Sequence, residues 1–189
     1  MEIWRVHGGL LIKFFFWIVL TLLAVGLLVF ISASFSVLTK SPGQFFRILV
    51  NQIGLGFIGG GIAMWITSRL NYTVWKKYAL PLLIIGLVAT ALVFIPGLGF
   101  EHGGARRWLD LGPFSLQPAE ILKIGFVVYM AAWLSWVRNK IDDVKFGLVP
   151  FLLMTGVTAG LLLMQPDTGT LIVILAAGFC MFFVSGARW

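Results

Sequence analysis

Six long apolar runs are the feature that most constrains how this chain can fold. The first, residues 14–37, carries no charged side chain and exceeds the roughly 20 residues with which a helix crosses a bilayer. Short segments rich in proline, glycine or charge, typical of turns, separate the runs. They predict an all-α integral membrane protein with about six transmembrane helices in a single polytopic domain, residues 1–189. The expected helices are residues 14–37, 45–67, 78–95, 118–137, 146–164 and 171–185.

The amino-acid composition agrees with this class and excludes others. Hydrophobic residues make up 60% of the chain and charged residues 11%, against about 25% charged in a soluble domain. The net charge of +7 could indicate a nucleic-acid partner, but the basic residues form no stripe with interleaved aromatics, so we expect none. The single cysteine, Cys180, excludes an internal disulfide and a cysteine-based zinc cluster.

Lysine and arginine are unevenly divided between the two sides that six alternating helices would create. The positive-inside rule assigns the richer side, which holds both termini, to the cytoplasm. Residues 96–117 then form an outer loop, on the same face as residues 165–170. The cytoplasmic set is Arg5, Lys13, Arg69, Lys76, Lys77, Arg138, Lys140, Lys145 and Arg188, and the outer set is Lys40, Arg47, Arg106 and Arg107.

Two segments of this outer face carry a family resemblance. They are GARRWLDLGPFSLQPAEILK, which ends at Lys123, and QPDTGT, which begins at Gln165. Both resemble signature segments of the SEDS family, the polytopic FtsW/RodA-type peptidoglycan glycosyltransferases. The run Asn71–Gly99 resembles the division-type FtsW branch more than the RodA branch. Members of the family have about ten spanning helices, so the resemblance implies that this chain corresponds to the first part of that fold.

The resemblance also implies an activity, a location and partners. The substrate would be lipid II, an undecaprenyl-pyrophosphate-linked disaccharide peptide, polymerised into glycan strands outside the bacterial cytoplasmic membrane during cell division or wall growth. A class B penicillin-binding protein transpeptidase and other division proteins would be partners, at the division septum. The family's proposed general base lies in a second-half loop that this sequence does not include. We therefore assign no catalytic residue, and expect the 189-residue chain alone to insert into a membrane but to be inactive.

Three neighbouring residues of the outer loop are candidates for substrate binding. Arginine presents a planar fork to phosphate oxygens, so Arg106 and Arg107 could hold a pyrophosphate as its charge grows in the transition state. The alternative is that they anchor the loop to lipid headgroups. Trp108 could stack on a sugar or belong to the aromatic belt at the membrane surface.

The start of the fourth expected helix supplies three further candidates. Gln117 precedes Pro118 at the first helical position, and Glu120 in the first turn is favoured by the helix dipole. Lys123 follows on the same face, roughly 4.5 Å deeper by helical rise, and is expected to pair with Glu120. The pair could be a structural ion pair, which would lessen the cost of burying Lys123, or a charged wall of the substrate cavity.

Asp167, the last candidate, precedes the sixth expected helix, where aspartate is an ordinary N-cap. We expect capping as its main role. A secondary role in organising the cavity or binding a divalent cation stays open, although one carboxylate does not make a metal site. We expect no other cofactor.

Two other functions would use the same residues. A lipid II transporter or flippase would bind the substrate without covalent change, but no clear internal repeat of the kind common in transporters is visible. A non-catalytic division scaffold would recruit the transpeptidase and would not need the charges of the outer loop.

Overall fold

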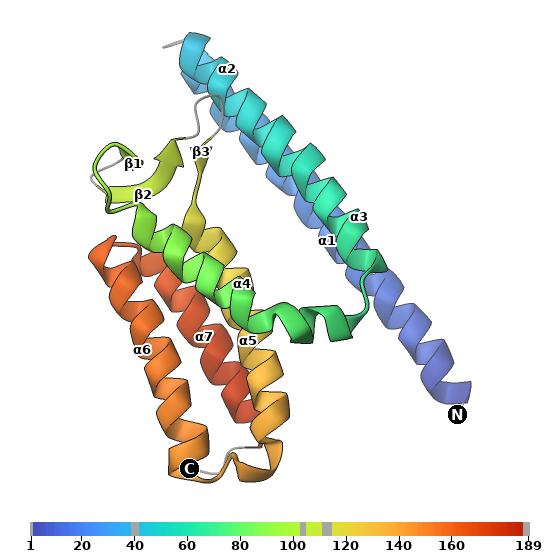
Figure 1. Cartoon of the computed structure of the whole chain (residues 1–189). Helices are drawn as coiled ribbons and strands as arrows, with labels where there is room; N and C mark the ends of the chain where they lie inside the picture. Colours follow the sequence, from blue (N-terminus) through green and yellow to red (C-terminus); the bar gives the residue numbers. More distant parts are fainter. Residues whose placement is uncertain (1, 39–41, 103–104, 111–114, 187–189) are drawn as a thin grey trace. The chain divides into compact units, whose positions relative to one another are not determined.

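The computed structural model describes residues 2–38, 42–102, 105–110 and 115–186 (Figure 1). The chain divides into two compact units, Met1–Gly54 and Leu55–Trp189, which are described separately. Their boundary falls within a π-helical segment, Asn51–Gly59, that continues α2 into α3. The expectation of a single membrane domain stays a prediction.

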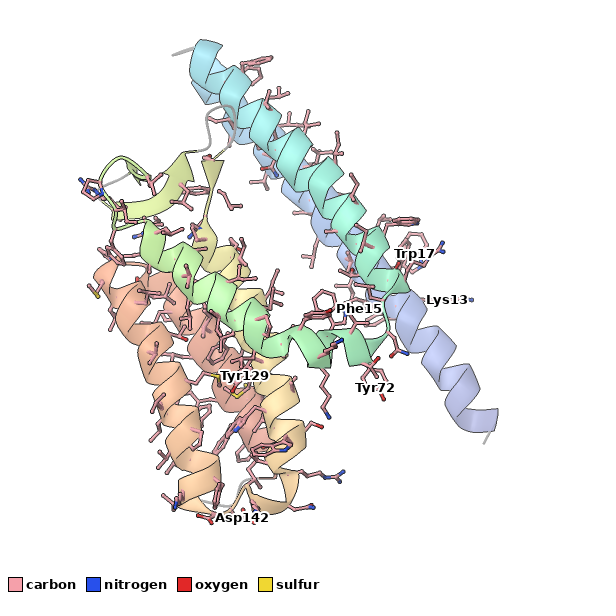
Figure 2. The ribbon with its side chains drawn as sticks, viewed as in Figure 1. Lys13, Phe15, Trp17, Tyr72, Tyr129 and Asp142 are labelled. Atoms are coloured by element: carbon pink, nitrogen blue, oxygen red, sulfur yellow. The ribbon has the colours of Figure 1, made fainter. Side chains whose placement is uncertain are left out.

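The first unit contains α1 (Glu2–Leu38) and α2 (Pro42–Val50). Helix α1 begins at Glu2, ahead of the expected start at residue 14, and the stretch of it that could cross a membrane is Lys13–Ser34. Helix α2 begins at Pro42, ahead of the expected start at residue 45, because proline is pre-organised for the first helical position, where its missing N–H is not needed. Phe15 and Trp17 project from α1 with 68% and 62% exposed surface (Figure 2), and a helix that is apolar all round is typical of a membrane span.

The second unit contains five helices. They are α3 (Gly60–Arg69), α4 (Tyr72–Leu92), α5 (Pro118–Val137), α6 (Val149–Met164) and α7 (Thr168–Val184). Short 3-10 and π-helical turns, Arg138–Lys140 and Val144–Leu148, connect α5 to α6. Figure 2 shows Asp142 at this connection and Tyr129 among the helices above it.

The start of α4 differs from the expected residue 78. The Asn71 side chain accepts a hydrogen bond from the Thr73 N–H at 3.3 Å and caps a helix that begins at Tyr72. Pro81 therefore lies inside α4 rather than in its first turn, where proline removes a backbone hydrogen bond and kinks the helix. Figure 1 shows α4 bending along its length. The helix also ends earlier than expected, at Leu92 instead of residue 95.

The core of this unit is built around α5. Its buried side chains recur every three or four residues, which places them on one face of the helix. Two glycines bring α4 and α5 together: a Cβ on Gly86 would lie 2.7 Å from Leu122 Cα, and one on Gly125 would lie 2.8 Å from the Leu82 carbonyl oxygen. Small residues at such crossings let helix backbones approach closely in lipid. The buried residues of α5 include Ala119, Leu122, Phe126, Met130 and Leu134.

The connection between α4 and α5 is not irregular throughout, as expected for residues 96–117, but contains a small antiparallel sheet in the order β1-β2-β3. The strands are β1 (Gly99–His102), β2 (Ala105–Asp110) and β3 (Ser115–Leu116). Phe100 pairs with Trp108, and Leu109 with Leu116. Strand pairing satisfies backbone groups in a loop next to apolar helices. The protein is therefore predominantly but not entirely α-helical.

Within the described residues, five helices are long and apolar enough to cross a membrane. They cover Lys13–Ser34, Ile48–Arg69, Tyr72–Leu92, Pro118–Lys140 and Val144–Met164, and a shorter apolar helix covers Thr168–Val184. The prediction of a multi-pass helical membrane protein is confirmed. The sixth helix is 17 residues long, slightly short of the roughly 20 residues of a full span, so its crossing of the membrane stays a prediction.

Candidate functional site

Arg107 on β2 joins the α4–α5 connection to the turn between α6 and α7. Its Nε donates to the Gln165 carbonyl oxygen at 3.4 Å, and its Nη2 donates to the Pro166 carbonyl oxygen at 2.5 Å. Its Nη1 lies 4.0 Å from Asp167 Oδ1. The planar guanidinium suits this arrangement because several N–H donors point in fixed directions. Arg107 is therefore a structural clamp on the turn, although 36% of its side chain is still exposed.

Asp167 is the buried partner in this junction, with 4% of its surface exposed. Its Oδ1 accepts a hydrogen bond from the Thr170 N–H at 3.3 Å, which confirms the predicted cap on α7. Its Oδ2 accepts from the Gln117 side-chain amide at 3.1 Å. A buried carboxylate needs such partners because desolvating an unpaired charge is costly. Gln117 thus holds the start of α5 against the start of α7.

Gln165 is a member of this site that the sequence reasoning did not single out. It is 1% exposed, and its Nε2 donates to the Thr90 carbonyl oxygen at 2.7 Å. That carbonyl belongs to the last turn of α4, where helix geometry leaves backbone oxygens without partners. A glutamine directly after the apolar run of α6 was the available signal. Its Oε1 accepts no hydrogen bond from the residues that the structure describes.

These contacts form one connected set, which we call the loop–turn network. It joins the end of α4, strand β2, the start of α5 and the α6–α7 turn, between residues 50 to 75 positions apart in sequence. The network attaches the α4–α5 connection to the helices. Its members are Thr90, Arg107, Gln117, Gln165, Pro166 and Asp167.

Glu120 and Lys123 form the predicted ion pair in the first turns of α5. Lys123 Nζ lies 2.9 Å from Glu120 Oε2, and the two side chains are 29% and 55% exposed. Lys123 is partly buried and Glu120 is exposed, so the pair keeps access to solvent or headgroups. Its role as a structural pair or as a wall of the substrate cavity stays a prediction. An exposed pair of this kind contributes only about 0–1 kcal/mol. Lys123 is therefore available to contact a ligand.

Arg106 and Trp108 lie on β2 on either side of Arg107. The register with β1 shifts here, because Phe100 pairs with Trp108 and Glu101 with Arg106, so Arg107 is the extra residue of a β-bulge. Arg106 is exposed and Trp108 is half-buried.

The donor set around Asp167 does not fit a divalent cation. Both carboxylate oxygens already accept hydrogen bonds, and a guanidinium lies beside one of them. In the described part of the chain, no three His, Cys, Asp or Glu residues gather where they could hold a metal ion. The side chains of Glu101, His102 and Asp110 lie outside the described residues.

The chain matches known proteins over nearly its full length. The family model FTSW_RODA_SPOVE, described as "Cell cycle protein", matches residues 13–189. A protein named "Probable peptidoglycan glycosyltransferase FtsW" from Aliivibrio salmonicida is 37% identical over 91% of this chain and 42% of its own length. One of the same name from Trichlorobacter lovleyi is 34% identical over 90% of this chain and 44% of its own length. The chain thus spans less than half the length of these relatives.

Solved structures agree with the sequence relatives. The rod shape determining protein RodA of Thermus thermophilus is 32% identical with a TM-score of 0.64, over 79% of this chain and 46% of that one. A chain from a study of "polymerization and crosslinking by a peptidoglycan synthase complex" is 30% identical with a TM-score of 0.63, over 82% of this chain and 44% of that one. The long family match, together with these likenesses, shows that this chain belongs to the FtsW/RodA/SpoVE family.

Proposed function

We propose that this chain forms part of a peptidoglycan glycosyltransferase that polymerises lipid II at the outer face of the bacterial cytoplasmic membrane. The observation that carries the proposal is the loop–turn network, which holds an arginine-bearing loop in a fixed place over the helix ends. Relatives named as peptidoglycan glycosyltransferases FtsW support it, at 34–37% identity over about nine tenths of this chain.

The reaction needs a group that stabilises the departing pyrophosphate. Preorganised positive charge serves this purpose because it is in place before negative charge develops. Lys123 is the best placed candidate, since its side chain is partly exposed and Glu120, with which it pairs, is itself exposed. Arg107 is 36% exposed and could also contact a phosphate. Arg106 and Trp108, its neighbours on β2, are candidates for headgroup or sugar contacts.

Asp167 does not serve as the general base in this proposal. Its carboxylate is buried, caps α7 and accepts from Gln117, so an incoming hydroxyl could not reach it without breaking the loop–turn network. A general base must lie within hydrogen-bond reach of the proton that it accepts. We infer that the base comes from a segment present in the longer relatives.

Polymerisation of purified lipid II tests the proposal. A protein that joins this chain to the remaining half of a relative should produce glycan strands in detergent, whereas the 189-residue chain alone should not. A flippase would move labelled lipid II across a vesicle membrane and form no strands, and a scaffold would do neither. Translocation without strands from the joined protein would contradict the proposal.

Orientation can be tested separately with reporter fusions. A reporter active only in the cytoplasm should work after Arg69, Lys140 or Trp189 and fail after Gly103 or Thr168, because the basic connections favour the cytoplasmic side. Activity after Gly103 would place the loop–turn network on the wrong face for an extracellular substrate.

We also propose a class B penicillin-binding protein as a partner, together with other division proteins at the septum. The similar chain from a peptidoglycan synthase complex supports this assignment. Complex formation should persist when Lys123 is replaced by alanine, since partner binding does not need that charge. Loss of the complex in this variant would show that Lys123 contributes to the interface with the penicillin-binding protein rather than to the substrate site.

A further inference from the structure

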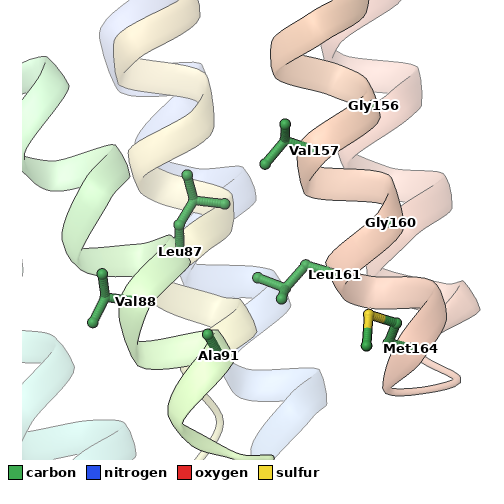
Figure 3. A pocket seen from close by; sticks show the side chains of 8 residues that line it. All are labelled: Leu87, Val88, Ala91, Gly156, Val157, Gly160, Leu161 and Met164. Atoms are coloured by element: carbon green, nitrogen blue, oxygen red, sulfur yellow. The ribbon is translucent and has the colours of Figure 1, made fainter.

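The second unit has two surfaces that the loop–turn network does not use. One is an apolar groove in which Leu87 and Ala91 on α4 face Leu161 and Met164 on α6 (Figure 3). None of the described residues that line this groove is polar, so its chemistry does not distinguish one apolar occupant from another. The other surface is the connection between α5 and α6, at the opposite end of α6. Its charged residues are Arg138, Lys140, Asp142, Asp143 and Lys145.

Two lysines of this connection lie over one aromatic ring. The Nζ atoms of Lys140 and Lys145 are 5.1 and 5.8 Å from the centroid of the Phe146 ring. These distances are within the roughly 6 Å at which the quadrupole of an aromatic ring attracts a cation. Both lysine side chains are exposed, and an exposed lysine without such a contact samples many rotamers. The ring therefore holds two ammonium groups near each other, although like charges repel.

The backbone that carries the two lysines is fixed by packing and by its own hydrogen bonds. Ile141 is 4% exposed, and a Cβ on Gly147 would overlap the Ile141 carbonyl oxygen, so only glycine fits at this position. The Asp143 side chain accepts a hydrogen bond from the Lys145 N–H at 2.9 Å. One of the two carboxylates of the connection is thus engaged with the backbone.

The connection lies where one membrane span ends and the next begins. The two candidate spans are Pro118–Lys140 and Val144–Met164, so both ammonium groups are at the level where hydrocarbon gives way to headgroups. Apolar side chains beside them stay exposed, with Val144 at 52%, Phe146 at 40% and Val149 at 49%. Cations next to exposed apolar surface at this level suit a molecule that carries an anion on hydrocarbon chains.

We propose that the α5–α6 connection binds an anionic phospholipid of the bilayer, with the lipid phosphate between Lys140 and Lys145 and the start of an acyl chain against Phe146. A phosphate accepts hydrogen bonds from both ammonium groups and offsets their repulsion. Free phosphate would meet the two charges but would leave the apolar side chains uncovered. The lipid site is separate from the loop–turn network and takes no part in the proposed reaction.

Photolabelling in lipid nanodiscs tests this site without requiring catalysis. The probe is a phosphatidylglycerol with a diazirine at the glycerol end of one acyl chain, present as a minor component in phosphatidylcholine nanodiscs that hold the 189-residue chain. Label should map to residues 138–149. Replacing half of the phosphatidylcholine by unlabelled phosphatidylglycerol should lower this labelling at least fivefold, because the two anionic lipids compete for one site. A surface without selectivity would be labelled equally in both mixtures, and this result would overturn the proposal.

Substitution of the two lysines tests the assigned residues. Lys140→Gln combined with Lys145→Gln removes both charges and should lower labelling of residues 138–149 at least fivefold. The matched control, Lys13→Gln combined with Lys76→Gln, removes two exposed lysines from other helices and should change labelling less than twofold. Phe146→Leu keeps an apolar side chain but removes the ring, and should lower labelling about twofold to threefold.

Two further outcomes would contradict the assignment. Equal labelling of the double variant and its control, with unfolding temperatures in detergent that match the unsubstituted chain, would show that the lysine pair does not bind the lipid. Loss of labelling on addition of inorganic phosphate would show a site for free anions instead of a site for a lipid of the bilayer. Retained labelling in phosphate supports the lipid site, because a soluble anion lacks the acyl chain that contacts Phe146.

Discussion

Two ion pairs at the helix ends near the small sheet, Lys123–Glu120 and Arg107–Asp167, differ more in burial than in distance. Lys123 and Glu120 approach to 2.9 Å, whereas Arg107 and Asp167 are 4.0 Å apart. The closer pair is three residues apart on one helix, with Lys123 29% and Glu120 55% exposed. The longer one joins residues 60 positions apart, and only 5% of the Asp167 side chain is exposed.

The difference in burial outweighs the difference in distance. Coulomb energy depends on the effective dielectric constant as well as on separation, and water around an exposed pair screens it strongly. Arg107 also donates to two carbonyl oxygens. Asp167 also accepts a hydrogen bond from Gln117 and caps α7. The longer pair, Arg107 and Asp167, therefore stabilises the fold. In the shorter pair, Lys123 can contact a ligand without loss of stability.

Asp167→Ala should give the largest loss of stability. It removes a helix cap, worth about 1 kcal/mol, and the Gln117 hydrogen bond, worth about 1 kcal/mol. We expect a total near 2 kcal/mol and a Tm about 4–8 °C lower for a chain of this size, measured by thermal unfolding in detergent. Asp167→Asn keeps an oxygen for the cap and should lose about half as much. Equal losses for the two variants would show that charge, rather than hydrogen bonding, holds the junction.

Arg107→Ala should have the next largest effect, about 1–2 kcal/mol, because two hydrogen bonds from a charged donor to carbonyl oxygens are lost. Hydrogen exchange at the amides of residues 165–170 should quicken. Arg107→Lys should recover only part of the protection, since an ammonium cannot reproduce the planar fork.

The matched control for this change is Arg106→Ala, on the exposed neighbour in β2. It should change exchange at the turn little, because interactions of an exposed charge are screened. If hydrogen exchange at residues 165–170 becomes equally fast in both alanine variants, the positive charge of the loop, rather than the hydrogen bonds of Arg107, protects the turn.

The contrast between the two pairs also explains what the sequence could predict. Helical periodicity places residues three apart on one face, so the pairing of Glu120 with Lys123 and the bounds of the helix 118–137 followed from local pattern. Contact between Arg107 and the α6–α7 turn, and the burial of Gln165, depend on how distant segments pack, for which no local pattern exists. The short strands were missed because charged and turn residues obscure their alternation. The start of α4 was missed because its first turns are polar, although Asn71 was a visible cap.

The smallest expected change in stability, and the sharpest test of the comparison, is Lys123→Ala. Since Glu120 is 55% exposed, water can solvate its carboxylate after the lysine is gone, and the loss should stay below about 0.5 kcal/mol. Polymerisation of lipid II by the joined protein should nevertheless fall at least about tenfold, equivalent to about 1.4 kcal/mol of transition-state stabilisation.

Glu120→Gln is the control, because it breaks the same pair and leaves the lysine charge in place. It should match Lys123→Ala in detergent-solubilised yield and Tm but retain most of the polymerisation. If both variants lose activity equally, the pair acts as a unit and Lys123 does not contact the leaving group independently. If yield falls with activity in Lys123→Ala, the pair is structural, and the distinction drawn from burial between the two ion pairs fails.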